Sequence, residues 1–147
     1  MREESGRSLI EIIGVLAIGV TMLVAAYGMY KTIDQRQKRL IAYEAVQDVA
    51  KKTRILYAFS GYSSVSVANL QSDQAIESTQ TPIGTSWSIG PNDDNNAQFK
   101  IRLEGLDYAD CEYFRIKKAD WAIEKQINYN ENGQCGDGNN VVDFIVE

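Results

Sequence analysis

Residues 8–30 read SLIEIIGVLAIGVTMLVAAYGMY. Apart from Ser8, Glu11 and Thr21 it is apolar, and a helix of about 20 such residues spans a bilayer. A cleavable secretory signal is the alternative, but its apolar core has only about 7–15 residues and a small-residue cleavage site behind it. No clear cleavage site follows this longer stretch, so the sequence predicts a membrane-spanning helix.

The next segment, residues 31–59, contains no proline or glycine. Its apolar side chains recur at spacings of three and four, which places them on one face of a helix with the bases off that face. These side chains are Ala42, Ala45, Val46, Val49, Thr53 and Leu56. We expect one helix over residues 8–59, about 75 Å long at 1.5 Å per residue, with Gly61 at its end.

The rest of the chain predicts short strands and one more helix. Alternating apolar residues indicate strands at 87–89, 99–103, 121–129 and 141–146. A helix is expected over residues 107–118 with Asp107 as its N-cap, and Asn132-Gly133 is a strong turn signal. The expected fold class is α+β, with a small antiparallel sheet lying on the long N-terminal helix.

The composition limits the classes of function. There is no histidine, which removes the commonest general base and the commonest metal ligand. The sequence contains no GxSxG motif, Walker loop or histidine-based triad. The net charge of −5 argues against a dedicated nucleic-acid-binding protein. We therefore expect no enzyme activity, catalytic residue, cofactor, metal or nucleic-acid partner.

The charge is distributed unevenly along the chain. Residues 31–54 hold seven bases and three acids, whereas residues 73–147 hold six bases and fourteen acids. Two solvated surfaces of opposite sign would explain this. The alternative is that the basic helix of one subunit attracts the acidic part of another.

Two cysteines, Cys111 and Cys135, lie in the polar half of the chain. An even count permits one bridge in an oxidising compartment, and this bridge would contribute about 3–3.5 kcal/mol in the chain-entropy model. A zinc or redox pair is the alternative. We favour the disulfide, because two cysteines without histidine or a CxxC motif make a poor metal site.

Several polar clusters have both a structural and a functional interpretation. Residues 92–96 and 137–139 are oxygen-rich loops, which suit solvated turns better than a calcium site because the helix-flanked loop closed by glutamate is absent. Four acids lie around the expected helix start, where negative charge is stabilising. These acids are Glu104, Asp107, Asp110 and Glu112.

The strongest motif begins the apolar stretch, where residues 6–11 read GRSLIE. A short polar leader, MREESG, ends in Gly6, and Glu11 follows five residues later within an apolar helix. A carboxylate in a bilayer costs about 2.5–3.5 kcal/mol on insertion scales, so Glu11 needs a partner. In the alternative interpretation the chain is a plain signal anchor, and the side chain of Glu11 extends to the membrane surface.

This arrangement resembles the class III leader and N-terminal helix of type IV pilins and pseudopilins. The resemblance implies that prepilin peptidase cleaves the Gly6–Arg7 bond and that the new amine of Arg7 is methylated. It also implies that Glu11 pairs with the N-terminal amine of a neighbouring subunit during assembly. The chain departs from the family at Arg7, where an apolar residue is usual, and in the two acids of its leader.

Within that family the chain is most similar to the type IVb pilins. Most type IVa pilins and major secretion pseudopilins have a kinking proline late in the span, and this chain has none before Pro82. Residues 81–111 also follow the type IVb order of turn, strand, asparagine-rich loop, strand and helix with the first cysteine. In type IV pilins, a disulfide such as Cys111–Cys135 pins the C-terminal region to the head.

The resemblance divides the chain into a leader (1–6), a membrane-spanning and assembly half of the helix (7–30), an amphipathic half (31–59) and a soluble α+β head (60–147). It implies insertion in the inner membrane with a periplasmic head, followed by assembly into an extracellular filament of identical subunits and other pilins. The other implied partners are prepilin peptidase, an assembly platform in the inner membrane and a motor ATPase. Bases after the span favour a cytoplasmic head instead, but the cysteines and the leader motif outweigh them.

The expected function is that of a structural subunit of a type IV pilus, in adhesion, aggregation, motility or conjugation-type contact. One alternative is a pseudopilin of a type II secretion or DNA-uptake system. The other is a signal-anchored periplasmic or surface binding domain, which would need neither Glu11 nor cleavage after Gly6.

Overall fold

The computed structural model describes residues 3–129 and 131–147, and side chains from residue 8 onward. Its elements are α1 (Glu3–Tyr57), α2 (Val67–Ser72), β1 (Ser86–Asn92), β2 (Asn95–Leu106), α3 (Tyr108–Ile116), β3 (Glu124–Ile127) and β4 (Asn140–Val146). The chain forms two compact units, Met1–Gln37 and Lys38–Glu147. We call residues 38–147 the packed unit and residues 8–30 the apolar segment.

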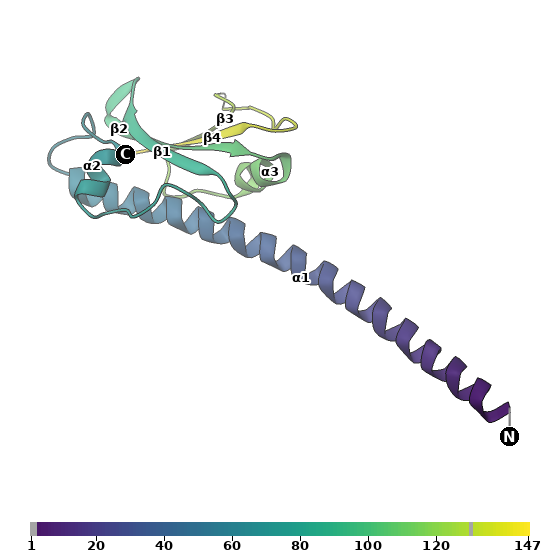
Figure 1. Ribbon diagram of the computed structural model, residues 1–147. Helices are drawn as coiled ribbons and strands as arrows, with labels where there is room; N and C mark the ends of the chain where they lie inside the picture. The colour runs from purple at the N-terminus through teal and green to yellow at the C-terminus, as the bar shows by residue number, and fades with distance from the viewer. Residues whose placement is uncertain (1–2, 130) are drawn as a thin grey trace. The chain divides into compact units, whose positions relative to one another are not determined.

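The packed unit is an α+β structure, which confirms the predicted class. Its four strands form one antiparallel sheet in the order β1-β2-β4-β3 (Figure 1). The register pairs Ile101 of β2 with Ile89 of β1 on one side and with Phe144 of β4 on the other. These three side chains therefore lie on the same face of the sheet, and the part of α1 within the packed unit covers that face.

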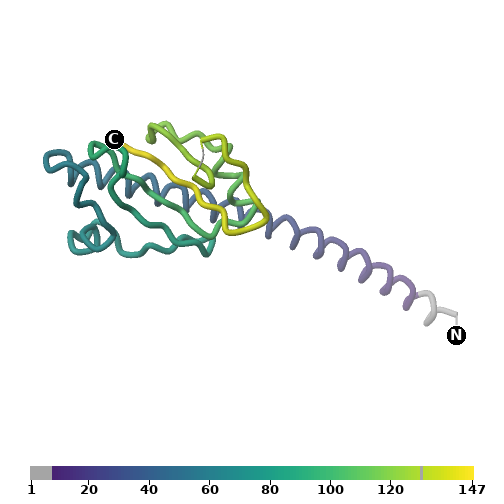
Figure 2. The backbone as a smooth tube through the Cα atoms, turned by 90° about the horizontal axis from the view of Figure 1, so that it is seen from above, coloured from purple at the N-terminus to yellow at the C-terminus, as the bar shows by residue number. Residues whose placement is uncertain are grey.

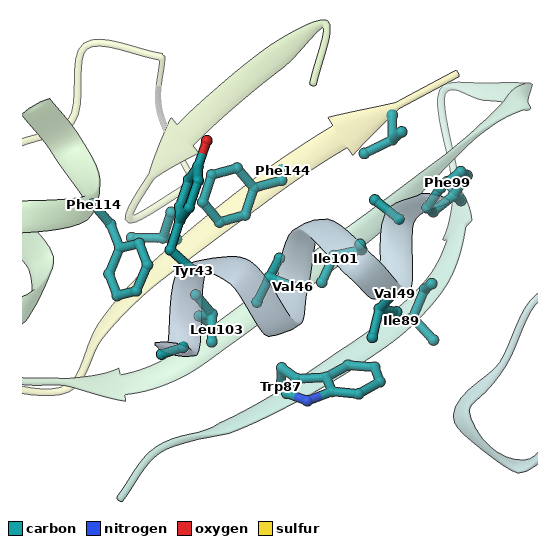
Figure 3. Packing of buried hydrophobic residues seen from close by; sticks show 14 of the residues in the cluster. Tyr43, Val46, Val49, Trp87, Ile89, Phe99, Ile101, Leu103, Phe114 and Phe144 are labelled. Atoms are coloured by element: carbon teal, nitrogen blue, oxygen red, sulfur yellow. The ribbon is translucent and has the colours of Figure 1, made fainter. Parts of the chain in front are cut away.

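The core lies between this helix and the sheet. Figure 3 shows Tyr43, Val46 and Val49 of α1 in one cluster with Phe99 and Phe144 of the sheet. Val46 and both phenylalanines have no exposed area. The 3.6-residue period of the helix and the two-residue period of the strands place these apolar side chains opposite one another.

The predicted stripe of α1 is correct in its first part and wrong at its end. Val46, Val49 and Thr53 are buried, but Leu56 is 46% exposed and Tyr57 is buried in its place. Tyr57 lies four residues after Thr53 and therefore continues the stripe, whereas Leu56 is turned away from the sheet. The helix itself ends at Tyr57, two residues before the predicted end.

The predicted helix after residue 107 is confirmed as α3, and Asp107 is its N-cap. Asp107 Oδ1 accepts a hydrogen bond of 2.6 Å from the backbone N–H of Asp110. This bond satisfies one of the N–H groups that have no partner within the helix. The helix ends at Ile116, and Lys117 takes an extended conformation at the C-cap.

The predicted strand over residues 121–129 is too long. Only Glu124–Ile127 pairs, as β3, because Asn128 and Tyr129 have φ angles of +50° and +66° that end the extended conformation. Trp121 precedes the strand and is buried through a side-chain contact: its Nε1 donates to the Tyr43 hydroxyl at 2.8 Å.

Three other features add to the predictions or refine them. Helix α2 begins after Ser66, whose side chain accepts from the N–H of Asn69. Strands β1 and β2 form a hairpin around the oxygen-rich residues 92–95. Asn132-Gly133 lies in the longer connection of residues 128–139 between β3 and β4, so its turn does not join two paired strands directly.

Candidate functional site: the apolar segment and the disulfide-closed region

The apolar segment exposes apolar side chains in all directions. Their exposed fractions run from 56% at Ile12 to 71% at Ile10, Val15 and Leu23. The mean hydropathy of its most apolar 18-residue window is 2.5, so α1 is long and apolar enough to cross a membrane by length and composition. A surface of this kind needs lipid or other apolar helices around it.

Glu11 is the one acid in the apolar segment. Its side chain is exposed and lies beside Ser8, Ile12, Val15 and Leu16 at a shallow groove on the helix surface. None of the ion pairs among the described side chains includes Glu11. Thr21, by contrast, is satisfied within the helix, since its hydroxyl donates to the Ile18 carbonyl at 2.8 Å. Among the side chains that the structure describes, the Glu11 carboxylate therefore has no ion-pair partner on this apolar surface.

The predicted cleavage site, Gly6–Arg7, lies near the start of α1. Its backbone belongs to that helix. The Arg7 side chain lies outside the described side chains, so the site remains a prediction from the leader motif.

The predicted disulfide is present. Cys111 of α3 is bonded to Cys135 of the 128–139 connection, and their Cα atoms are 5.8 Å apart. Cys111 is fully buried and Cys135 is half-buried. Because Cys111 lies on a helix and Cys135 on an irregular connection, the bridge ties that connection to the core of the packed unit.

Two asparagines hold the same connection at its ends. Asn128 Nδ2 donates to the Gln134 carbonyl at 2.8 Å, and its Oδ1 accepts from the Val141 N–H at 3.0 Å. Asn140, with 1% of its surface exposed, donates to the carbonyls of Leu106 and Gly136 and accepts from the Gly136 N–H. The connection is thus fixed by hydrogen bonds to its backbone as well as by the disulfide.

Lys125 of β3 closes the C-terminal end of α3. Its Nζ donates to the carbonyls of Phe114 (2.9 Å), Arg115 (2.7 Å) and Lys117 (2.9 Å). These three bonds match the three N–H donors of a lysine ammonium group and satisfy carbonyls that have no partner within a helix end. Burial, together with the nearby Arg115 charge, lowers the pKa of Lys125.

Polar contacts also hold α3 and the C-terminal residue against α1, within the segment of α1 that belongs to the packed unit. Arg39 Nε donates to Asp110 Oδ1 of α3 at 2.5 Å, and both side chains are largely buried. Near the other end of α1, Arg54 donates to the carbonyl oxygens of Glu147 and Trp121. Figure 2 shows the C-terminus close to this end of α1.

The acid cluster near the start of α3 has structural partners. Asp107 caps the helix, Asp110 pairs with Arg39, and Glu112 pairs with Arg115 at 2.7 Å. Glu104 lies 3.9 Å from Arg102. Among residues 3–129 and 131–147, no three histidine, cysteine or acidic side chains are grouped as metal ligands.

The sequence alone did not identify Lys125, Asn128, Asn140 or the Arg39–Asp110 pair. Their partners are distant in sequence or are backbone carbonyls, and neither leaves a periodic signal. The Arg39–Asp110 contact joins residues 71 positions apart. The one available hint was the residue type of Asn128, since asparagine adopts a positive φ more readily than most residues.

Comparison with protein-family models finds no match for this chain, and comparison with curated proteins finds none either. The features of the chain that bear on its function are therefore the apolar segment, Glu11 and the architecture of the packed unit.

Proposed function

We propose that this chain is a type IV pilin-like subunit, most similar to the type IVb class, that is anchored in a membrane and then assembled into a filament. The observation that carries the proposal is the composition of α1. One helix contains an apolar segment exposed on all sides and, farther along, the residues that form one wall of an α+β core. A plain membrane anchor does not need its helix to continue as the central element of the folded domain.

The proposed mechanism follows from the apolar surface. Burying one leucine or isoleucine side chain contributes about 1.5–3 kcal/mol, so an apolar helix cannot leave a bilayer for water at acceptable cost. It can leave when the helices of neighbouring subunits bury it instead. Successive subunits would therefore bundle their apolar segments into a filament core, with the packed units outside. The energy for extraction would come from a separate motor ATPase acting through an assembly platform.

Glu11 gives each added subunit a specific position. Cleavage of the Gly6–Arg7 bond by prepilin peptidase creates a positive amine at Arg7, a few residues before Glu11. In a bundle, the Glu11 carboxylate of one subunit pairs with this amine of its neighbour, which offsets the cost of placing either charge in an apolar surrounding. The pair also selects the axial offset between neighbouring helices.

The disulfide supports the proposed location. Structural disulfides persist in oxidising compartments, such as the periplasm and the cell exterior. Cys111–Cys135 fixes a long connection that has little regular structure of its own. We therefore place the packed unit in the periplasm before assembly and at the cell exterior afterwards.

The first prediction concerns processing. Intact-mass measurement of protein isolated from membranes that contain prepilin peptidase should show loss of residues 1–6 and a mature start at Arg7, with or without one methyl group. A matched sample from cells that lack the peptidase should keep the leader. If residues 1–6 are still present in the first sample, the chain is a signal-anchored domain and the pilin proposal is wrong.

A further inference from the structure

One end of the packed unit presents an exposed apolar side chain among bases. Ile116, the last residue of α3, is 73% exposed. Arg115, Lys117 and Lys118 surround it in the sequence. Arg115 is paired with Glu112, and the Lys117 ammonium lies over the Tyr43 ring, 5.2 Å from its centroid, so the exposed Lys118 supplies the positive charge beside Ile116. We call this surface the Ile116 knob.

The opposite end of the packed unit has an apolar groove between α1 and residues 73–80. One part, of about 220 Å³, is lined by Lys52, Ile55, Leu56, Asp73 and Ala75. It continues into a part of about 310 Å³ that shares Lys52 and Ala75. Ile55 is 75% exposed and Leu56 46%, so two large apolar side chains of this groove face solvent together. We call this surface the acidic groove.

The name reflects the charge of its rim. Asp48 and Lys52 form an ion pair of 2.8 Å, so their charges offset each other. Asp73 and Glu77 are exposed and belong to none of the ion pairs found among the described side chains. The rim therefore has a net negative charge around an apolar floor. The Ile116 knob has the complementary arrangement, an exposed apolar side chain with the base Lys118 two residues away.

The two surfaces lie at opposite ends of the packed unit. The Arg39–Asp110 contact places α3 beside the first residues of the packed unit's part of α1, whereas Ile55 and Leu56 near its last turn line the groove. Figures 1 and 2 both show α3 and the region of α2 at different ends of the sheet. A contact between two different surfaces is heterologous, and it generates an open chain when its rotation does not close a ring.

We propose that the Ile116 knob of one copy docks into the acidic groove of a second copy of this chain. Ile116 would lie against Ile55 and Leu56, and Lys118 would face Asp73 and Glu77 across the rim. This inference rests on the proposed function, because a filament requires an open, repeating contact, and it names the contact between packed units that the filament would use.

The test places a photo-cross-linking amino acid, p-benzoylphenylalanine, at position 116 of the full chain. Equal amounts of ¹⁵N-labelled and unlabelled chain are mixed at high concentration in detergent micelles, irradiated and analysed by peptide mass spectrometry. We expect mixed-isotope links from position 116 to residues 52–56 or 73–77 of another chain. Links to other surfaces, links within one chain, or no links between chains would overturn the proposal.

Charge exchange tests the recognition step in the same cross-linking chain. Lys118→Glu should lower the yield of these links about two- to fivefold, the range expected for an exposed ion pair, and Glu77→Lys should do the same. The two changes together should restore the yield, because they recreate a pair of opposite sign. Lys100→Glu, on strand β2, is the control and should leave the yield unchanged. Equal yields in all four variants would mean that charge does not guide the contact.

The outcomes separate this inference from the proposed function. If the chain is cleaved after Gly6 and forms filaments without the position-116 link, the knob-and-groove contact is wrong and the filament proposal stands. If the link forms but the leader is retained in the presence of prepilin peptidase, the contact is correct and the filament proposal is wrong.

Discussion

The apolar segment and the packed unit achieve stability in opposite ways. In the packed unit, side chains such as Leu103 and Phe144 are fully buried by the chain itself, and every buried side-chain polar atom in the described part has a hydrogen-bond partner. In the apolar segment, Leu16 is still 62% exposed. The packed unit thus contains its own core, whereas the apolar segment depends on lipid or on other chains.

This difference determines where each substitution should have its effect. A change in the apolar segment should alter membrane insertion or assembly, and a change in the packed unit should alter the free energy of unfolding. Tryptophan fluorescence can follow the packed unit separately, because both tryptophans of the chain, Trp87 and Trp121, lie in it.

The largest effect is expected from Glu11→Ala. In the proposed bundle this change leaves the neighbouring amine without a counter-charge, a loss of about 3–5 kcal/mol for a buried pair, so the yield of filament should fall more than about a hundredfold. Insertion of the single chain into the membrane should improve if anything, since a charge has been removed. The measurement compares sheared filament with membrane-bound chain in cells that contain the assembly machinery.

Two variants sharpen this test. Glu11→Asp keeps the charge on a shorter side chain and should give an intermediate filament yield. Glu131→Ala removes an exposed acid from the packed unit and should leave the yield normal. Normal filament from Glu11→Ala would show that the carboxylate has no role in assembly, which would favour the plain signal anchor.

The same substitution in each region gives the most direct comparison. Leu103→Ala removes a fully buried side chain from β2 and should lower the free energy of unfolding by about 2–5 kcal/mol. Leu16→Ala lies in the apolar segment and should leave the fluorescence-detected unfolding of the packed unit unchanged. A large shift from Leu16→Ala would mean that the two regions do not unfold independently.

The sequence predicted the elements whose stability depends on local pattern. The N-terminal helix was recognisable from its apolar stretch and the stripe of Val46, Val49 and Thr53, and α3 from the capping position of Asp107. The strand over residues 121–129 was overestimated because the alternation of apolar residues continues where the backbone does not. Asn128 and Tyr129 adopt positive φ angles, and Trp121 is buried by the Tyr43 contact.

The residues of the candidate site also fall into those that a local sequence pattern identifies and those that it does not. Glu11 and the two cysteines were found because each is unusual for its local surroundings: an acid within an apolar stretch, and a single pair of cysteines. Lys125 and Asn140 look like ordinary polar residues in the sequence. Their roles depend on which backbone carbonyls the tertiary fold brings near them, and no local pattern encodes this.

The disulfide should have the next largest effect on the packed unit. Cys111 and Cys135 are 24 positions apart, so opening their bridge should cost about 3–3.5 kcal/mol in the chain-entropy model. The double variant Cys111→Ala/Cys135→Ala should therefore unfold at lower denaturant concentration, measured by tryptophan fluorescence. Adding a reductant should destabilise the natural chain and not this variant. Equal stability with and without the bridge would show that the asparagine hydrogen bonds alone hold the 128–139 connection.

The smallest of these effects is expected at Lys125, a position that no sequence pattern singles out. Lys125→Met keeps most of the aliphatic stem but removes the ammonium group that binds three carbonyls at the end of α3. A cation at a helix C-terminus contributes up to about 2 kcal/mol when partly buried, so we expect a loss of about 1–2 kcal/mol in the free energy of unfolding. Lys100→Met, on β2 and separated from β3 by β4, is the matched control and should change stability by less than about 0.5 kcal/mol. The two variants differ in hydrogen bonding and hardly at all in size, so denaturant unfolding of both isolates the cap. If they are equally stable, water replaces the lysine at these carbonyls without cost, and α3 is held by Cys111 and by the Arg39–Asp110 pair.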